Sequence, residues 1–109
     1  MIDQSYQSCI QACLECAAAC NYCAVACTQE DDIKMMARCI QLDMECAALC
    51  YASAQIMSLG GSKAREICSL CADICEACGD ECAEHEATHC QECAAKCKHC
   101  AVECGRMAA

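Results

Sequence analysis

Cysteines recur along the chain in steps of three and four residues, at positions where helices normally carry apolar side chains. An average step of about 3.5 keeps a row of side chains on one face of a helix, whereas a strand needs a period of two. Each cysteine row therefore predicts a helix whose core-facing side is lined with thiols. Three rows are complete: Cys9, Cys13, Cys16, Cys20, Cys23 and Cys27; Cys68, Cys71, Cys75, Cys78 and Cys82; Cys90, Cys93, Cys97, Cys100 and Cys104.

The segment between the first two rows is sparser, because it carries only Cys39, Cys46 and Cys50. The same steps, counted outward from these cysteines, place five further residues on the stripe, all able to meet a metal or a thiol: Asp32, Met36, Asp43, Ser53 and Met57. A drift of one residue would instead turn Leu42 toward the core in place of Asp43. Both registers remain open at this level.

Helix breaks divide the chain into four segments. Alanine is abundant and proline is absent, which favours long helices. Thr28 followed by Asp31 predicts the cap of a second helix, and the acidic residues 30–32 suit a helix N-terminus. Gly60 and Gly61 form the strongest break, with Ser62 as the predicted cap of the third helix.

The last break is weaker and lies between residues 84 and 88. Thr88 and Gln91 have the spacing of a capping box, which predicts the start of the fourth helix. Four helices of roughly 18 to 27 residues joined by short turns predict an all-α fold, an antiparallel up-down-up-down four-helix bundle with a cysteine-lined core. At 109 residues, the chain is expected to form one domain, residues 1–109.

Charge and apolar length limit the partners and the compartment. The net charge of −9 argues against binding to nucleic acid or to an anionic membrane surface. No stretch reaches the roughly 18 apolar residues of a membrane span, and residues 1–5 lack the features of a secretion signal. We therefore expect a cytoplasmic protein with reduced thiols, where many cysteines indicate metal binding rather than disulfides.

Charge also favours one kind of metal. A monovalent ion that replaces a thiol proton adds no net charge, whereas a divalent ion held by four thiolates leaves about two negative charges per site. Buried uncompensated charge is costly, so the soft monovalent ion Cu(I), bound in multiple copies, fits best. Zn(II) or another soft metal is the alternative, because paired cysteines also build tetrahedral zinc sites. A thiol redox buffer is a further alternative for the metal-free protein.

An enzyme is not expected. Cys82 and His85 could be drawn as a nucleophile and its base, but the sequence offers no third orienting group and no glycine-rich anion site. Reactive cysteines are usually few and exposed, whereas these are many and turned inward.

The repeated three- and four-residue cysteine spacing resembles that of the bacterial copper storage proteins. The segment Cys82-Ala-Glu-His85-Glu-Ala-Thr-His89-Cys90-Gln-Glu-Cys93 carries this similarity most specifically, and the resemblance covers essentially the whole chain. It implies a bundle filled with many Cu(I) ions, mostly held between two thiolates. It also implies a cytosolic homotetramer. Copper donor or acceptor proteins are further expected partners. The second segment, with three cysteines, departs from a full row.

Antiparallel topology predicts what gathers at each end of the bundle. One end, here called the terminus end, collects Ile2, Tyr6, Met57, Ala64 and Met107, and it is expected to form an apolar plug. The other, here called the histidine end, collects soft and borderline ligands and is expected to be the copper entrance. Its members are Cys27, Met36, Cys39, Cys82, His85, His89 and Cys90, with Asp32 nearby.

The predicted metal ligands are thus the nineteen cysteines together with His85, His89, Met36 and Asp43. For the two histidines, the alternative is that they are solvated loop residues. His99 lies off the cysteine row and is expected on the surface.

Overall fold

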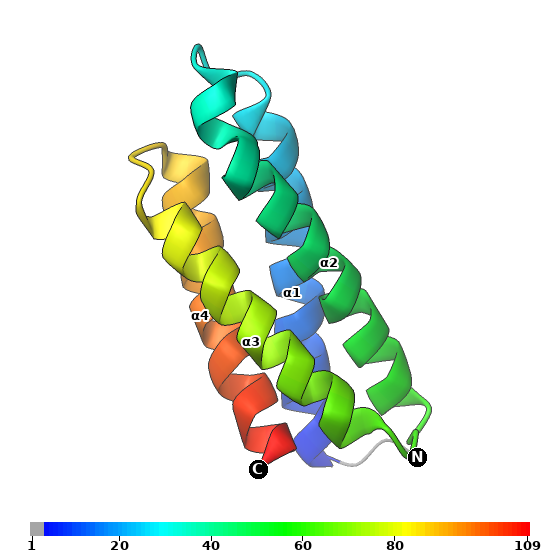
Figure 1. The fold of residues 1–109 in the computed structure, drawn as a ribbon. Coiled ribbons are helices and arrows are strands. Elements are labelled where there is room, and N and C mark those ends of the chain that lie inside the picture. The colour runs from blue at the N-terminus through cyan, green and yellow to red at the C-terminus, as the bar shows by residue number, and fades with distance from the viewer. Residues whose placement is uncertain (1–3) are drawn as a thin grey trace.

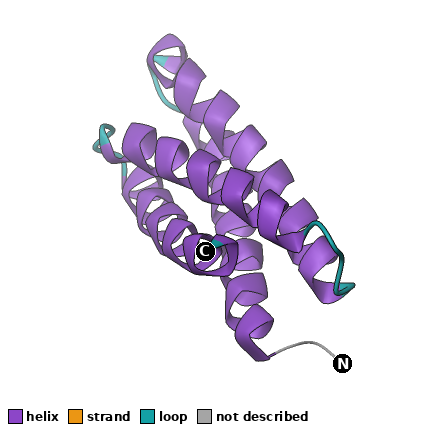
Figure 2. Ribbon diagram, turned by 60° about the horizontal axis from the view of Figure 1, so that its bottom comes forward, coloured by secondary structure: helices purple, strands orange, loops and turns teal. Residues whose placement is uncertain are grey.

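Four long helices account for most of the chain in the computed structural model, which describes residues 4–109. They are α1 (Gln4–Cys27), α2 (Ala37–Ser58), α3 (Ala64–Ala83) and α4 (Thr88–Ala108), and a short 3-10 helix, η1 (Ile33–Met36), precedes α2. The connections between them are short, so consecutive helices run antiparallel (Figures 1 and 2). The prediction of an all-α, up-down-up-down four-helix bundle is confirmed.

Each helix contacts two neighbours. Helix α1 packs against α2 and α4, and α3 packs against the same two helices, so α1 and α3 face each other across the core. The bundle is slender, with extents of 47 × 19 × 18 Å. The α1–α2 and α3–α4 connections lie together at one end, and the start of α1 and the end of α4 lie at the other (Figure 1). The shape therefore offers one long, narrow core rather than a broad one.

The capping predictions were wrong in detail. Thr28 donates its hydroxyl to the carbonyl of Val25, closing the end of α1 at 2.6 Å, and does not cap a second helix. The cap there is Asp32, which accepts from the backbone N–H of Met35 at the start of η1. Loop geometry decided this, since a hydroxyl near a helix end can bond to either the preceding or the following turn.

The other two predicted caps were also wrong. Helix α3 begins at Ala64, so Ser62 lies in the turn before it, and Lys63 occupies the cap position without a side-chain bond. Thr88 is the first residue of α4 rather than its cap. Gln91 instead donates its side-chain amide to the carbonyls of Ala83 and His85, which ties the start of α4 to the preceding connection.

The break after α2 was predicted well. Gly60 has φ +66°, a left-handed conformation that favours glycine. The Gly61 N–H bonds to the Ile56 carbonyl and the Gly60 N–H to the Met57 carbonyl, both at 3.0 Å. These two bonds form a Schellman motif, which satisfies carbonyls that the helix end would leave unpaired.

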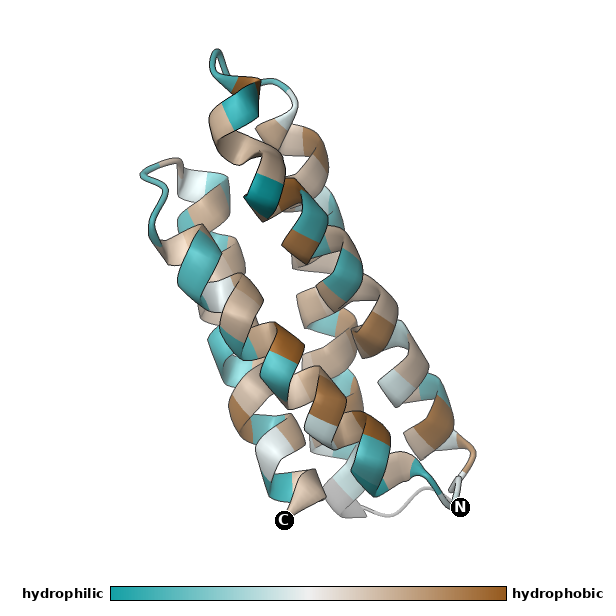
Figure 3. Cartoon of the chain, viewed as in Figure 1, coloured by the Kyte–Doolittle hydropathy of each residue, from teal (hydrophilic) through white to brown (hydrophobic). Residues whose placement is uncertain are grey.

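The segment Tyr6–Cys27 of α1 has the length and apolar composition of a membrane-crossing helix. The expectation that no stretch would reach this level was therefore wrong. Much of its apolar character comes from six cysteines, all of which are buried inside the bundle. The segment is thus a core helix of the bundle. Figure 3 shows mostly hydrophilic colours along the α1–α2 and α3–α4 connections.

The register of α2 is settled by the fold. Asp43 is fully buried, at 0% exposure, and its carboxyl group meets thiols of three helices. Leu42 is 5% exposed and is also buried. The stripe therefore does not drift, and the register with Asp43 facing the thiols holds. Burial of Leu42 as well follows from α2 packing against both α1 and α3.

Candidate metal centre

The core is a continuous column of sulfur atoms. All nineteen cysteines are buried and free, with exposures of 0–1%. Eighteen of them lie within 4.0 Å of another cysteine sulfur. The shortest of these contacts, between Cys39 and Cys82, is 3.4 Å, far longer than a disulfide bond of about 2.05 Å. The column therefore consists of separate thiols in van der Waals contact.

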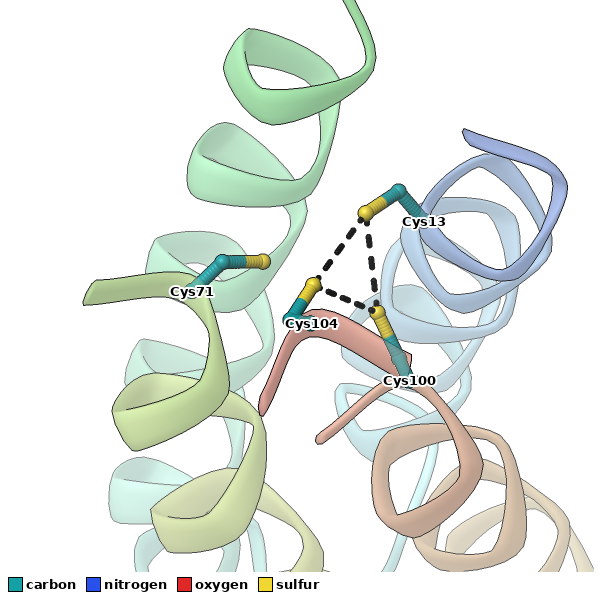
Figure 4. A group of neighbouring side chains, drawn as sticks. All are labelled: Cys13, Cys71, Cys100 and Cys104. Atoms are coloured by element: carbon teal, nitrogen blue, oxygen red, sulfur yellow. Dashed lines mark hydrogen bonds between the residues drawn. The ribbon is translucent and has the colours of Figure 1, made fainter. Parts of the chain in front are cut away.

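The sulfurs gather in groups of four that follow one another along the bundle. Within each group all sulfur atoms lie within 4.8 Å of one another. Figure 4 shows the group of Cys13, Cys71, Cys100 and Cys104, which come from α1, α3 and α4. Further groups are Cys16, Cys46, Cys50 and Cys75; Cys16, Cys20, Cys46 and Cys97; Cys20, Cys78, Cys93 and Cys97; and Cys23, Cys27, Cys39 and Cys90.

Successive groups share members. Cys16 and Cys46 belong to two of these groups, and so do Cys20 and Cys97. Separate tetrahedral sites would each need four thiolates of their own. A shared thiolate can serve two groups only if it bridges metal ions. The arrangement therefore suits a metal that accepts few ligands and tolerates bridging sulfur, which is the chemistry of Cu(I) with thiolates.

Burial favours the protonated thiol at two cysteines of the histidine end. Removal from water raises the pKa of Cys90 to about 11 and also raises the pKa of Cys27, at the histidine end. Metal binding at these positions must therefore displace a thiol proton. A monovalent ion leaves the charge of the core unchanged by that exchange.

Asp43 lies among the thiols on α2. Its Oδ1 accepts from Cys78, Cys82 and Cys93 at 3.2, 3.5 and 3.4 Å, and its Oδ2 accepts from Cys39 at 3.8 Å. Burial, which removes the carboxyl group from water, raises the pKa of Asp43 to about 10. Asp43 is therefore protonated and neutral at pH 7 in the metal-free bundle.

His89 connects the column to the surface at the histidine end. Its Nδ1 lies 3.4 Å from Cys23 Sγ and 3.5 Å from Cys90 Sγ. Its Nε2 lies 3.2 Å from the Oε2 of Glu30, in the α1–η1 connection. A carboxylate can only accept, so the Nε2 carries the hydrogen and the Nδ1 directs its lone pair toward the two sulfurs. Metal-binding histidines are commonly oriented by such a carboxylate.

His85 is held in the same way. Its Nε2 lies 2.8 Å from Glu81 Oε2, one helical turn earlier, and Arg38 lies 3.7 Å from the other oxygen of that carboxylate. A cavity of about 570 Å³ opens beside it. Its lining comes from both connections at this end: Glu30, Met35, Met36, Glu84, His85, Glu86 and Ala87. Met36 is nearly fully buried, at 2% exposure.

The two histidines are not solvated, since their side chains are only 10% and 13% exposed, although His85 lies in the α3–α4 connection. His99 is exposed on α4, as predicted from its position off the row. Asp32 is exposed and caps the start of η1, so it stabilises the connection near the histidine end. The chain's own orienting carboxylates, Glu30 and Glu81, were missed by the sequence analysis. The spacing of Glu81 four residues before His85 was the available signal.

The terminus end is less apolar than expected. The Sγ of Cys68 lies 3.6 Å from the Sδ of Met57, so this methionine extends the sulfur column rather than only covering it. Glu103 is buried there, at 8% exposure, and accepts from Ser8 at 2.6 Å and from Arg106 at 2.8 Å. Tyr6 and Met107 pack partly buried against the core. Ile2, also assigned to this end, lies outside the described residues.

Known structures share this architecture. The Cu(I)-bound copper storage protein BsCsp3 is 46% identical, with a TM-score of 0.93 over 97% of this chain and 100% of that chain. The apo form of copper storage protein 3 from Bacillus subtilis is 47% identical, with a TM-score of 0.90 over 94% and 98% of the two chains. A cytosolic copper storage protein from Streptomyces lividans, loaded with five coppers, is 38% identical, with a TM-score of 0.93 over 96% and 92%.

Among curated proteins, none matches the chain at a significant level. The family model described as copper storage protein matches residues 2–109, which is nearly the whole chain. That match agrees with the column of free thiols and with the similarity to copper-loaded bundles. The chain belongs to the copper storage protein family.

Proposed function

We propose that this protein stores Cu(I) at high capacity, with the core thiols as ligands. The observation that carries the proposal is the continuous column of nineteen buried, free cysteines whose neighbouring groups share sulfurs. Copper-bound bundles of the same family support it. Each Cu(I) that binds replaces one thiol proton, which passes to solvent, and the buried core remains neutral. The protein acts as a reservoir and not as a catalyst.

The ligand set is the nineteen cysteines, supplemented by His85, His89 and Met36 at the histidine end. Asp43 completes the proposed set, although a carboxylate is a harder ligand than Cu(I) prefers. Its four thiol contacts support a role in ordering sulfurs during loading. Cytosolic storage is supported by the Streptomyces lividans relative, and we place this chain in the cytoplasm as well.

Copper enters at the histidine end. Three observations support this direction: the inward Nδ1 of His89, the carboxylates on both histidines, and the cavity beside His85 and Met36. Imidazole and thioether are neutral ligands that hold Cu(I) without a thiolate's charge, so they suit a first binding site that holds the ion transiently. Copper donor or acceptor proteins would exchange the ion here. The net charge of −9 argues against nucleic acid and anionic membranes as partners.

The protein assembles as a homotetramer through the outer face of α1 and α2. Among the residues of α1, Glu15 is the one charged side chain. Leu14, Tyr22 and Val25 are 46%, 70% and 66% exposed on this helix. Met44 and Tyr51 are 61% and 48% exposed on the adjacent α2. Apolar faces of this kind mark association surfaces. A sedimentation mass equal to the 11.6 kDa chain would contradict assembly.

The decisive test is an anaerobic titration of the reduced protein with Cu(I) against a chromogenic chelator. Bridging thiolates predict saturation near one Cu(I) per thiol, on the order of the nineteen cysteines. The alternative, a Zn(II) or other soft-metal buffer, predicts about four or five ions at four thiolates each. A thiol redox buffer predicts reversible disulfide formation with no metal retained against the chelator.

A further inference from the structure

The hydroxyl group of Ser53 is a polar group buried without a hydrogen bond in the core of this bundle. Ser53 is fully buried, at 0% exposure, in the second turn from the end of α2. Among the side chains that the structure describes, the Ser53 Oγ is the only buried oxygen or nitrogen atom without a hydrogen-bond partner. A buried, unpaired hydroxyl costs free energy, and such groups are uncommon in native proteins. The position therefore calls for a reason.

A second serine in the same helix shows that the bond is available. The Oγ of Ser58 donates to the carbonyl of Ala54, four residues earlier, at 2.7 Å. This back-bond is the usual way for a helical serine to satisfy its hydroxyl. Ser53 does not make the equivalent bond to Leu49. Its hydroxyl is thus left free on the face of α2 that meets the sulfur column.

The residues on either side of Ser53 along the stripe both contact sulfur. Three residues before it, Cys50 lies 3.7 Å from Cys71 and 3.9 Å from Cys100. Four residues after it, Met57 lies 3.6 Å from Cys68. Position 53 thus lies between two sulfur contacts of α2, at a step of the row where the other helices carry cysteine. The side chains that flank Ser53 on this stripe therefore both contact sulfur atoms of the core.

We propose that Ser53 donates a hydrogen bond to a copper-bound thiolate, and that it is a positioning residue for copper in the terminus half of the column. A neutral thiol is a weak acceptor, whereas an ionised sulfur accepts a shorter and stronger bond. When Cu(I) replaces a thiol proton and that proton leaves to solvent, the sulfur becomes such an acceptor. The hydroxyl that is unpaired in the empty bundle is then paired in the loaded one. This inference rests on the proposed storage of Cu(I).

The inference predicts opposite effects of one substitution on the two states. In the reduced, metal-free protein, Ser53→Ala removes an unpaired hydroxyl, so the thermal unfolding midpoint should stay the same or rise. In the copper-saturated protein, the same change removes a bond to thiolate. The chelator bathocuproine disulfonate should then remove copper from the terminus half of the column faster. We expect the rate for the most slowly released copper to rise by about three- to tenfold. A serine that only fills space would not reverse sign between the two states.

Two further variants make the result decisive. Ser58→Ala removes a hydroxyl that bonds to Ala54, so it should leave copper release unchanged. Ser53→Cys places a twentieth thiol on the row and should raise the capacity by one Cu(I) per chain, which tests whether position 53 faces the copper.

The inference is overturned if Ser53→Ala releases copper at the wild-type rate, or if it destabilises the metal-free and loaded proteins alike. An unchanged capacity of Ser53→Cys would also overturn it. These outcomes are separate from failure of the storage function itself. That failure would appear in the wild-type protein as saturation at four or five ions, or as no copper retained at all.

Discussion

The Nδ1 of His89 lies 3.4 Å from the Sγ of Cys23, although 66 residues separate them in the chain. The contact joins the last turns of α1 to the first turn of α4 and directs a neutral nitrogen ligand at thiols near the histidine end of the column. The opposite ring nitrogen lies against Glu30. An ion arriving at this end would thus meet imidazole before it reaches the sulfur column.

The first prediction concerns the two histidines. Replacing His85 and His89 together with Ala should slow both Cu(I) uptake and its removal by a chelator, because the proposed first binding site for the ion is lost. Total capacity should barely change, since the thiols remain. Stopped-flow uptake under anaerobic conditions measures the rates. Met107→Leu, at the terminus end, is the control, because it exchanges one apolar side chain for another. A larger effect of Met107→Leu than of the histidine pair would place the copper entrance at the terminus end and contradict the prediction.

The second prediction isolates the orientation of His89. Glu30→Ala removes the acceptor of the Nε2 hydrogen and frees the ring to rotate or change tautomer. Loss of such a supporting carboxylate weakens metal binding at other sites by about 10- to 100-fold, so uptake should slow measurably while capacity is retained.

Asp31→Ala is the matched control for that experiment. It removes the same charge from the neighbouring exposed position of the same connection. If both variants slow uptake equally, the effect is the charge of the connection, and Glu30 does not orient the histidine.

The third prediction concerns pH and Asp43. Its pKa of about 10 in the folded protein lies above the ordinary carboxyl value, so the folded state holds this proton more firmly than the unfolded state. The resulting stabilisation is complete below pH 4 and is lost as pH rises toward 10. The free energy of unfolding of the reduced, metal-free protein should therefore fall between pH 5 and 8, by up to about 1.4 kcal/mol per pH unit.

Asp43→Asn tests this slope because the amide does not titrate. Chemical denaturation of both proteins at a series of pH values, under reducing conditions, gives the two curves. The difference between the variant and the wild type should shift in favour of the variant as pH rises. Parallel curves between pH 5 and 8 would show that the carboxyl group titrates normally.

The fourth prediction concerns metal removal. Alanine and the helical spacing of the core should form the four helices without copper, so the reduced apo protein should give a helical circular dichroism spectrum. Ligands that bind only the folded state stabilise it, so copper should raise the unfolding temperature strongly. Stripping copper with a chelator should reverse the shift. A random-coil spectrum of the apo protein would mean that metal binding and folding occur together.

The sequence by itself determined where the helices lie along the chain and which face of each helix packs into the core. The steps of three and four between cysteines allow one periodic structure, and the glycine break at residues 60–61 separates the two hairpins. Short connections then require antiparallel neighbours. The metal-binding chemistry of the core could also be predicted from the sequence, because nineteen thiols on the inward faces of helices indicate binding of a soft metal. The spacing also placed His85, His89 and Met36 at one end together, since residues near alternate helix ends meet in an antiparallel bundle.

Only the tertiary structure decided which side chains bond to which. Thr28, Ser62 and Thr88 are good capping residues, but their bonds depend on the path of each connection, which no local pattern specifies. The choice of Asp43 over Leu42 depended on how α2 is rotated against its neighbours. The pairing of Glu30 with His89 and the unpaired hydroxyl of Ser53 depended on atoms brought together from distant parts of the chain. A hydrogen bond is decided within tenths of an ångström, whereas a sequence period fixes only the face of a helix.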